Sequence, residues 1–204
     1  IAGAIGESGS ILATLGAIPL AQAEQNGEKF ATSIGVKSLA ELRALDTQKV
    51  FEPATAGGFA SIGRFSITID GYFFPEAPSA IFAAGRHAHV PLLVGWNSEE
   101  MTGQLVLQGK PPTAENFKNA VKGLYGARAD EALKLYSGAT PEEIMDAATA
   151  LAGDRFIAYS TWKWADLHLK TGNSPVYRYF YARPRPAMKA SMGNAAPGLA
   201  GGVV

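Results

Sequence analysis

The stretch VPLLVGW, residues 90–96, decides the fold class of this 204-residue chain. It is an uninterrupted apolar run bounded by polar residues, His89 before it and Asn97 after it. A strand with one solvated face would alternate apolar and polar residues, whereas a short continuous run fits a strand of a parallel sheet that is buried on both faces. We therefore predict a buried parallel strand over residues 90–96.

Two carboxylates, Glu99 and Glu100, follow this strand directly. In open α/β sheets functional groups gather at the carboxyl ends of strands, and a glutamate there can act as the acid of a Ser-His-Glu triad. A structural interpretation stays open beside it. Asn97 with Glu100 three residues later has the pattern of a capping box, and acids in a first turn complement the helix dipole. On residue types alone the structural interpretation is favoured.

Outward from this strand, the chain is mostly helical. Apolar spacing and capping residues predict helices over 19–34, 39–46, 79–85, 113–126, 129–138 and 140–172. The segments 46–54, 56–63 and 187–204 are interpreted as a turn, a glycine-rich loop and a terminal loop. Residues 174–184 form a second clear strand, and 65–70 is a weaker one before the turn Asp70-Gly71.

This order of elements predicts an α/β fold with mostly parallel sheet pieces and many helices. Two clear strands are few for 204 residues. We expect that the sheet is incomplete and that strands are missing from one or both ends of the chain.

The stretch GESGS, residues 6–10, raises Ser8 as a candidate nucleophile. The nucleophile elbow of an α/β-hydrolase reads G-x-S-x-G. Gly6 stands two residues before Ser8, as that pattern requires, but the residue two after it is Ser10, and the glycine is at position 9. The preceding IAGAI lacks β-branched residues in a run. The pattern favours a simple turn after a short strand.

Composition excludes several classes of partner and site. Lys plus Arg and Asp plus Glu both number 18, which gives no bulk attraction to nucleic acid or an anionic membrane. The chain has no cysteine, hence no disulfide or thiolate metal site, and no apolar run reaches the length of a membrane span. No cofactor is indicated. Any signal peptide would lie upstream of Ile1, so the sequence is compatible with a secreted or periplasmic location. The compartment and the oligomeric state stay open.

The three histidines give no metal motif. His87 and His89 flank Ala88 near a predicted helix end, where imidazoles are usually structural, and no second ligand set follows. His168 lies on a predicted helix face. The order Ser8, Glu100, His168 imitates the Ser…Glu…His order of hydrolases, but order among frequent residue types is weak evidence. Trp162 and Trp164 either line a pocket or pack a helix.

Several stretches together resemble the type B carboxylesterases, the branch of the α/β-hydrolase fold that includes the cholinesterases. AIGESGS is similar to a segment shortly after the nucleophile elbow of that family. DGYFFPEAP, IFAAG and VPLLVGWNSEE resemble the family's succession "DG..lP..p", "G" and "vP.l.G.N.DEG", and STWKWADLHLKTGNSPVYRYFY is similar to its later helix and strand. The likeness runs in register over nearly the whole chain.

The resemblance implies that residues 1–204 are part of a single α/β-hydrolase domain, truncated at both ends. Glu100 matches the acid of the "DEG" motif, with Glu99 in the place of the aspartate and Met101 in the place of the glycine. The family's nucleophile would lie before Ile1 and its histidine after the tail. The expected function is hydrolysis of small-molecule carboxylic esters by a Ser-His-Glu triad in the intact protein, with this chain supplying Glu100 and inactive alone.

Two alternatives remain at this point. A noncatalytic, cholinesterase-like module for binding or adhesion would keep the fold without the triad. A small complete hydrolase would use Ser8, Glu100 and His168, but it would have to build its sheet and oxyanion hole from the few residues before Ser8.

Overall fold

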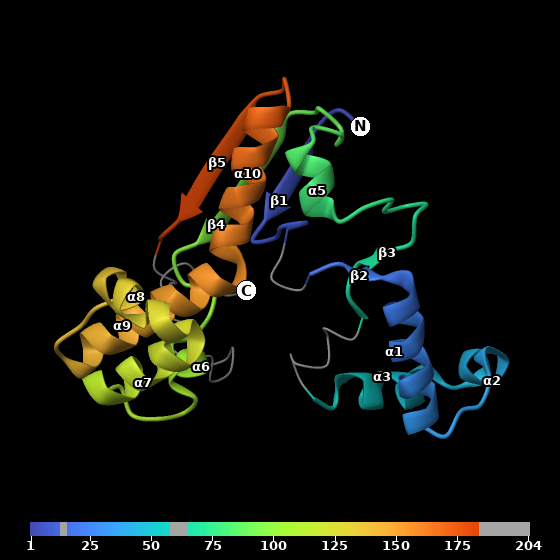
Figure 1. Cartoon of the computed structure of the whole chain (residues 1–204), viewed down its shortest axis with the longest axis horizontal. Helices are drawn as coiled ribbons and strands as arrows, with labels where there is room; N and C mark the ends of the chain where they lie inside the picture. The colour runs from blue at the N-terminus through green and yellow to red at the C-terminus, as the bar shows by residue number, and fades with distance from the viewer. Residues whose placement is uncertain (13–15, 58–64, 184–204) are drawn as a thin grey trace, which may run out of the picture. The chain divides into compact units, whose positions relative to one another are not determined.

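The computed structural model describes residues 1–12, 16–57 and 65–183. The chain forms two compact units, one made of residues 1–14 and 85–204 and the other of residues 15–84. The first unit contains the sheet that carries Glu100. The fold is a partial α/β fold in which parallel strands combine with many helices, as the sequence predicts (Figure 1).

The sheet of the first unit has three parallel strands in the order β1-β4-β5. They are β1 (Ala4–Glu7), β4 (Leu92–Asn97) and β5 (Val176–Tyr181). The predicted strands at 90–96 and 174–184 are thereby confirmed, and the short strand before Ser8 becomes the third member of the sheet. β4 is the central strand, so it receives hydrogen bonds on both sides, and its carboxyl end lies beside the ends of both neighbours.

One face of this sheet packs against α10 (Tyr159–Thr171), which runs alongside the strands in Figure 1. Leu92 and Val94 are buried there against Ala165. The opposite face is open among the described residues, where Leu93 is 37% exposed and its cross-strand neighbours Ile5 and Tyr177 are also exposed. The prediction that this strand is buried on both faces is therefore wrong for the described part of the chain, because α10 covers a single face.

Close packing explains the composition of β1. A Cβ on Gly6 would lie 2.5 Å from the ring of Trp164, which packs over the strand from α10. A β-branched residue at this position would collide with that ring. The strand therefore lacks the β-branched run expected of a central strand, although it is hydrogen-bonded to β4 along its whole length.

α10 is the last part of a nearly continuous helical segment, residues 141–171. This segment begins with α9 (Pro141–Gly153), passes through a π-helical turn at Asp154–Ala158 and continues as α10. The Thr140 hydroxyl accepts from the Glu143 N–H, and the Glu143 carboxylate accepts from the Thr140 N–H. This reciprocal capping box, with Pro141 in the first turn, confirms the helix start that the sequence predicts.

Four helices of the first unit share a second core. They are α6 (Gln104–Leu107), α7 (Ala114–Tyr125), α8 (Ala129–Leu135), which follows a 3₁₀ turn at Gly126–Arg128, and α9. Leu107, Val121, Ile144 and Leu151 are almost completely buried between them. α6 approaches α9 so closely that a Cβ on Gly103 would lie 2.9 Å from backbone atoms of α9.

The second unit contains short elements. They are β2 (Ile18–Pro19), α1 (Leu20–Ser33), α2 (Leu39–Ala44), α3 (Thr47–Thr55), β3 (Thr68–Ile69) and α5 (Pro78–Ala83). β2 and β3 form a parallel pair. Ser38 caps α2, since its hydroxyl accepts from the Glu41 N–H.

Two local predictions in the second unit need correction, and two others lie outside the described residues. Residues 46–54 form helix α3 instead of a turn, because the Asp46 carboxylate caps it by accepting from the Gln48 N–H. The predicted strand at 65–70 shrinks to the two residues of β3. Most of the predicted loop 56–63 and all of the tail 187–204 fall outside the described residues.

Candidate functional site

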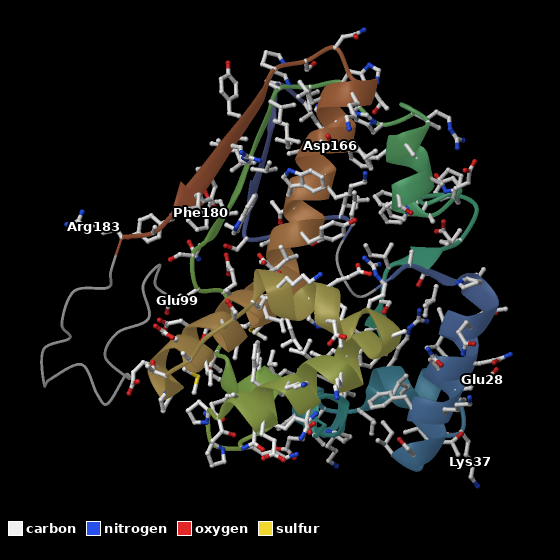
Figure 2. The ribbon with its side chains drawn as sticks, turned by 60° about the vertical axis from the view of Figure 1, so that its left-hand side comes forward. Glu28, Lys37, Glu99, Asp166, Phe180 and Arg183 are labelled. Atoms are coloured by element: carbon white, nitrogen blue, oxygen red, sulfur yellow. The ribbon has the colours of Figure 1, made fainter. Side chains whose placement is uncertain are left out.

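Glu100 lies just past the carboxyl end of the central strand. β4 ends at Asn97, and the next residue stays attached to the sheet because the Ser98 N–H donates to the Tyr181 carbonyl at 2.8 Å. Figure 2 shows Glu99 at this end of the sheet, with Asp166 farther along α10. The chain therefore leaves the sheet after Ser98, and Glu100 lies close to the carboxyl ends of the strands.

Two donors hold one oxygen of the Glu100 carboxylate. The Ser8 hydroxyl donates to Glu100 Oε1 at 2.5 Å, and the Asn97 N–H donates to the same atom at 2.6 Å. The Asn97 side-chain amide donates to Ser8 Oγ at 3.4 Å, which links the two partners. Hydrogen bonds to an ionised acceptor are short and strong, so these contacts fix the orientation of the carboxylate.

The capping-box interpretation of Asn97 and Glu100 is wrong in one respect. The bond from the Asn97 N–H to the Glu100 side chain is present, but the next helix, α6, begins at Gln104. The carboxylate therefore caps no helix at this point. It is held beside the end of the sheet, where the Ser8 hydroxyl and the Asn97 N–H orient it.

Ser8 reaches Glu100 through the register of the sheet. It follows β1 directly, and its N–H donates to the Gly95 carbonyl at 3.0 Å, so the carboxyl ends of β1 and β4 meet at one edge. Its φ is 46°, in the left-handed region that non-glycine residues seldom adopt. Such backbone strain persists where the surrounding structure enforces it, and it clusters at functional sites.

The chain after Ser8 is fastened to the start of α10. The Ser10 hydroxyl donates to the Ser160 carbonyl at 2.8 Å, and the Thr161 hydroxyl donates to the Gly9 carbonyl at 3.5 Å. Thr161 is completely buried. These bonds hold the turn of residues 8–10 in place and so help to keep Ser8 beside Glu100.

The π-helical turn lies next to the acid. A Cβ on Gly153, at the end of α9, would lie 3.7 Å from the backbone nitrogen of Glu100. The first residue of the turn, Asp154, accepts a hydrogen bond from the Tyr136 hydroxyl at 2.6 Å. Burial raises the pKa of Tyr136 well above its usual range, and the bond to Asp154 adds to the rise. Single π-helical turns inside α-helices are frequent at functional sites.

His168 lies at the other end of the sheet. It is 3% exposed, and its Nε2 donates to the Val90 carbonyl at 2.8 Å, just before β4 begins. The extended chain from Val90 to Asn97 spans roughly 20 Å. Ser8, Glu100 and His168 therefore form no triad, and the hypothesis of a small complete hydrolase built on them is wrong.

The remaining candidate residues take other roles. Trp162 lines a groove of about 350 Å³ between α10 and β5, with Ala165, Asp166, Leu169, Val176 and Arg178, whereas Trp164 packs over Gly6. A larger hollow of about 810 Å³ lies between α1 and α2 in the second unit. Neither is lined by Glu100.

The described residues contain neither a cluster suited to a metal ion nor a helix suited to crossing a membrane. No group of three or more His, Asp or Glu side chains in ranges 1–12, 16–57 and 65–183 is arranged to hold a metal ion. No helix in the part of the chain that the structure describes is long and apolar enough to cross a membrane.

Comparison with known proteins gives the family. The sequence model of the carboxylesterase family matches residues 1–198, nearly the whole chain. The chain belongs to the carboxylesterase family. Ester hydrolysis is the general activity that this carboxylesterase membership supports, and the partial α/β fold agrees with the α/β-hydrolase fold of the family. A search of curated proteins finds no match to this carboxylesterase chain.

From the sequence, Glu100 was proposed through the family resemblance and was paired with Asn97 through the capping-box pattern, but its contact with Ser8 was missed. Ser8 was weighed as a nucleophile and Asn97 as a helix cap, whereas both bind the acid. One signal for the Ser8 contact was present. Ser8 and Glu100 each follow a short strand, and the carboxyl ends of parallel strands meet at one edge of a sheet.

Proposed function

We propose that this carboxylesterase chain supplies Glu100 as the acid of a Ser-His-Glu triad that hydrolyses small-molecule carboxylic esters. The observation that carries the proposal is the placement of Glu100 at the carboxyl end of the central strand, with one carboxylate oxygen held by the Ser8 hydroxyl and the Asn97 N–H. The other oxygen, Oε2, is then the one that can accept from a histidine N–H.

The chemistry expected of the intact enzyme is acyl transfer. A serine hydroxyl attacks the ester carbonyl while a histidine takes its proton, and the same histidine returns the proton to the departing alcohol. Water then repeats the sequence on the acyl-enzyme and releases the acid. Glu100 would remain ionised throughout, orient the imidazole and stabilise the imidazolium that forms in each step.

In this proposal, Ser8 is a positioning residue. Its hydroxyl proton is committed to the Glu100 carboxylate, and all three histidines of the sequence are placed away from it, at the opposite end of β4. A serine without a base within reach is a weak nucleophile. In this proposal, the nucleophile and the triad histidine come from parts of the protein other than these 204 residues, which would form part of one α/β-hydrolase domain.

The first test is an esterase assay on the 204-residue chain with a short p-nitrophenyl ester. We expect no turnover above the uncatalysed rate. Robust turnover that Ser8→Ala abolishes would make Ser8 the nucleophile and overturn the proposal.

The second test uses the full-length protein and the two adjacent glutamates. Glu100→Gln keeps the size of the side chain but removes the charge that orients the histidine, so we expect kcat to fall by a factor on the order of 10³–10⁴. Glu99→Gln is the matched control and should change kcat by less than about threefold. Equal kcat values for Glu100→Gln and the unsubstituted enzyme would contradict the role of Glu100. A full-length protein without any esterase activity would favour the noncatalytic binding module.

A further inference from the structure

The three histidines of the chain lie together at the end of the sheet opposite to Glu100. The ring centroid of His87 is 4.6 Å from that of His168 and 4.9 Å from that of His89. His168 belongs to the last turns of α10, whereas His87 and His89 belong to residues 85–91, the segment that leads into β4. We call these three side chains the histidine cluster. The proposed esterase function uses none of them.

Hydrogen bonds to backbone carbonyls anchor two of the three rings. His168 Nε2 donates to the Val90 carbonyl at 2.8 Å, and His89 Nε2 donates to the Gly85 carbonyl at 3.0 Å. The Ser174 hydroxyl donates to the His89 carbonyl at 2.7 Å. Together these bonds join the segment 85–91 to the end of α10 and to the chain that follows it.

The packing around His87 is close. A Cβ on Gly172 would lie 3.4 Å from His87 Nε2 and 3.6 Å from His89 Cδ2. His87 is half-buried and His89 is exposed, so this contact is confined to the side of the cluster that faces Gly172. His168 is 3% exposed, so solvent screens a charge on it poorly.

The acidic side chain of α10 is already paired with two lysines. On α10, Asp166 is paired with Lys170 at 2.9 Å and with Lys163 at 3.6 Å. Residues 172–175, which follow α10, contain no ionisable side chain. A proton on His87 thus meets unfavourable electrostatic interactions with His168 and His89.

We propose that the histidine cluster is an acid-sensitive latch, which holds the segment 85–91 to the end of α10 while His87 is neutral and releases it when His87 gains a proton. The entry of the chain into the central strand would then loosen at mildly acidic pH, while the helical core around Val121 stays closed. This proposal is independent of the esterase function.

The electrostatics of His87 support the latch. Burial lowers the pKa of His87 below its usual value, and positive charges on His168 and His89 lower it further. The folded chain therefore binds a proton at His87 less readily than the unfolded chain does. The stabilisation from this group is complete above the unfolded pKa of about 6.5 and is lost as the pH falls from there toward the lower folded pKa.

Hydrogen exchange on the 204-residue chain tests the latch. The reporters are the Leu92 N–H, which donates to the Pro175 carbonyl, and the Gly172 N–H, which donates to the His168 carbonyl. Between pH 7.5 and pH 5.5 we expect their protection factors to fall several-fold, up to about tenfold, relative to that of the buried Val121 amide. A ratio that stays constant over this range would overturn the proposal.

Substitutions at His87 separate charge from packing. His87→Phe keeps a ring that cannot take a proton, so the reporter amides should stay protected at both pH values, whereas His87→Lys should expose them at both. The control Ser174→Ala removes a bond of the latch without changing a titrating group, so protection should fall equally at both pH values. A His87→Phe chain that still loses protection at pH 5.5 would contradict the latch.

A second measurement covers the case in which His87→Phe fails to fold. The imidazole signals of the unsubstituted chain, followed by NMR from pH 8 to pH 5, should show His87 titrating below the usual range of histidine. The reporter amides should lose protection over the same pH interval. Titration of His87 at an ordinary pKa would overturn the latch.

Discussion

At the scale of single residues, Ser8 combines a favourable hydrogen bond of its side chain with an unfavourable conformation of its backbone. Its hydroxyl donates to the Glu100 carboxylate at 2.5 Å, while its φ of 46° suits glycine better than serine. A residue that keeps a side chain in such a conformation points to a need for that side chain. The two contributions can be separated by substitution.

We expect Ser8→Ala to destabilise the unit that contains the sheet by about 2 kcal/mol, because the charged Glu100 loses a hydrogen bond. Ser8→Gly loses the same bond but relaxes the left-handed backbone, so it should be more stable than Ser8→Ala by about 1 kcal/mol. Urea unfolding followed by tryptophan fluorescence measures both values. A Ser8→Ala chain as stable as the unsubstituted one would show that the hydroxyl contributes nothing.

The residue scale also shows what a sequence can and cannot reveal about the site. Glu100 was proposed as the triad acid because VPLLVGWNSEE resembles a family motif, whereas its residue type and position alone favoured a structural role. The contact between Ser8 and Glu100 joins residues far apart in the chain and depends on the parallel register of β1 and β4. No local pattern encodes that register. The same limit applies to the histidine cluster, where His87 and His168 come from separate elements.

At the scale of elements, the glycine of β4 sets the distance between two strands. A Cβ on Gly95 would lie 2.2 Å from the Tyr179 ring and 2.4 Å from the Tyr179 carbonyl oxygen on β5. A ring can rotate away, but a backbone oxygen of a paired strand cannot do so without disturbing the ladder. The close approach of β4 and β5 therefore depends on the absence of a side chain here.

We expect Gly95→Ala to destabilise the sheet by about 3 kcal/mol through this overpacking. Gly123→Ala is the control, because Gly123 lies in α7 with no atom within 4 Å of the added Cβ. That substitution should stabilise the chain by about 1 kcal/mol through helix propensity. Urea unfolding curves of the two variants would contradict the packing argument if both shifted in the same direction.

Helices whose capping residues are visible in the sequence were predicted well. Elements whose residues are chosen by packing against distant parts of the chain were not. Thr113 and Thr140 each accept from a backbone N–H in the first turn of the helix that follows, as their positions predict. α3 was missed because Pro53 lies inside it and the Asp46 cap was interpreted as part of a turn. β1 gave a weak signal because Trp164 of a distant helix excludes large residues from Gly6.

At the scale of the whole molecule, the two units differ in the size of their cores. In the described part of residues 15–84, the buried hydrophobic side chains are Phe30, Val36 and Phe82. The other unit buries a helical core and a sheet core. A small buried core gives a low free energy of local unfolding. The smaller unit should therefore be the first to open.

This difference predicts two unfolding transitions. All three tryptophans, Trp96, Trp162 and Trp164, belong to the larger unit, so their fluorescence reports on it alone. Circular dichroism reports on the helices of both units and should show an additional loss of signal at lower urea concentration. Gly27 lies inside α1 with no atom within 4 Å of an added Cβ. Gly27→Ala should therefore shift the early loss of circular dichroism to a higher urea concentration and leave the fluorescence transition unchanged. Coincident transitions for both probes would contradict the prediction.

The division into two units was not visible in the sequence, because no linker-like stretch separates them. The prediction that residues 1–204 belong to one α/β-hydrolase domain stays a prediction. What the sequence did show is the family pattern, whose segments fall in both units, from DGYFFPEAP to VPLLVGWNSEE.

The pairing of β1 with β4 also determines when the sheet can form during synthesis. Ala4 pairs with Leu92, and the whole unit of residues 15–84 must be translated between them. At about 5–20 residues per second, β1 remains without its partner for several seconds after it leaves the ribosome. β4 then waits in turn for Val176 of β5. Until Tyr181 has been translated, the nascent chain therefore presents unpaired strand edges, which are prone to aggregation.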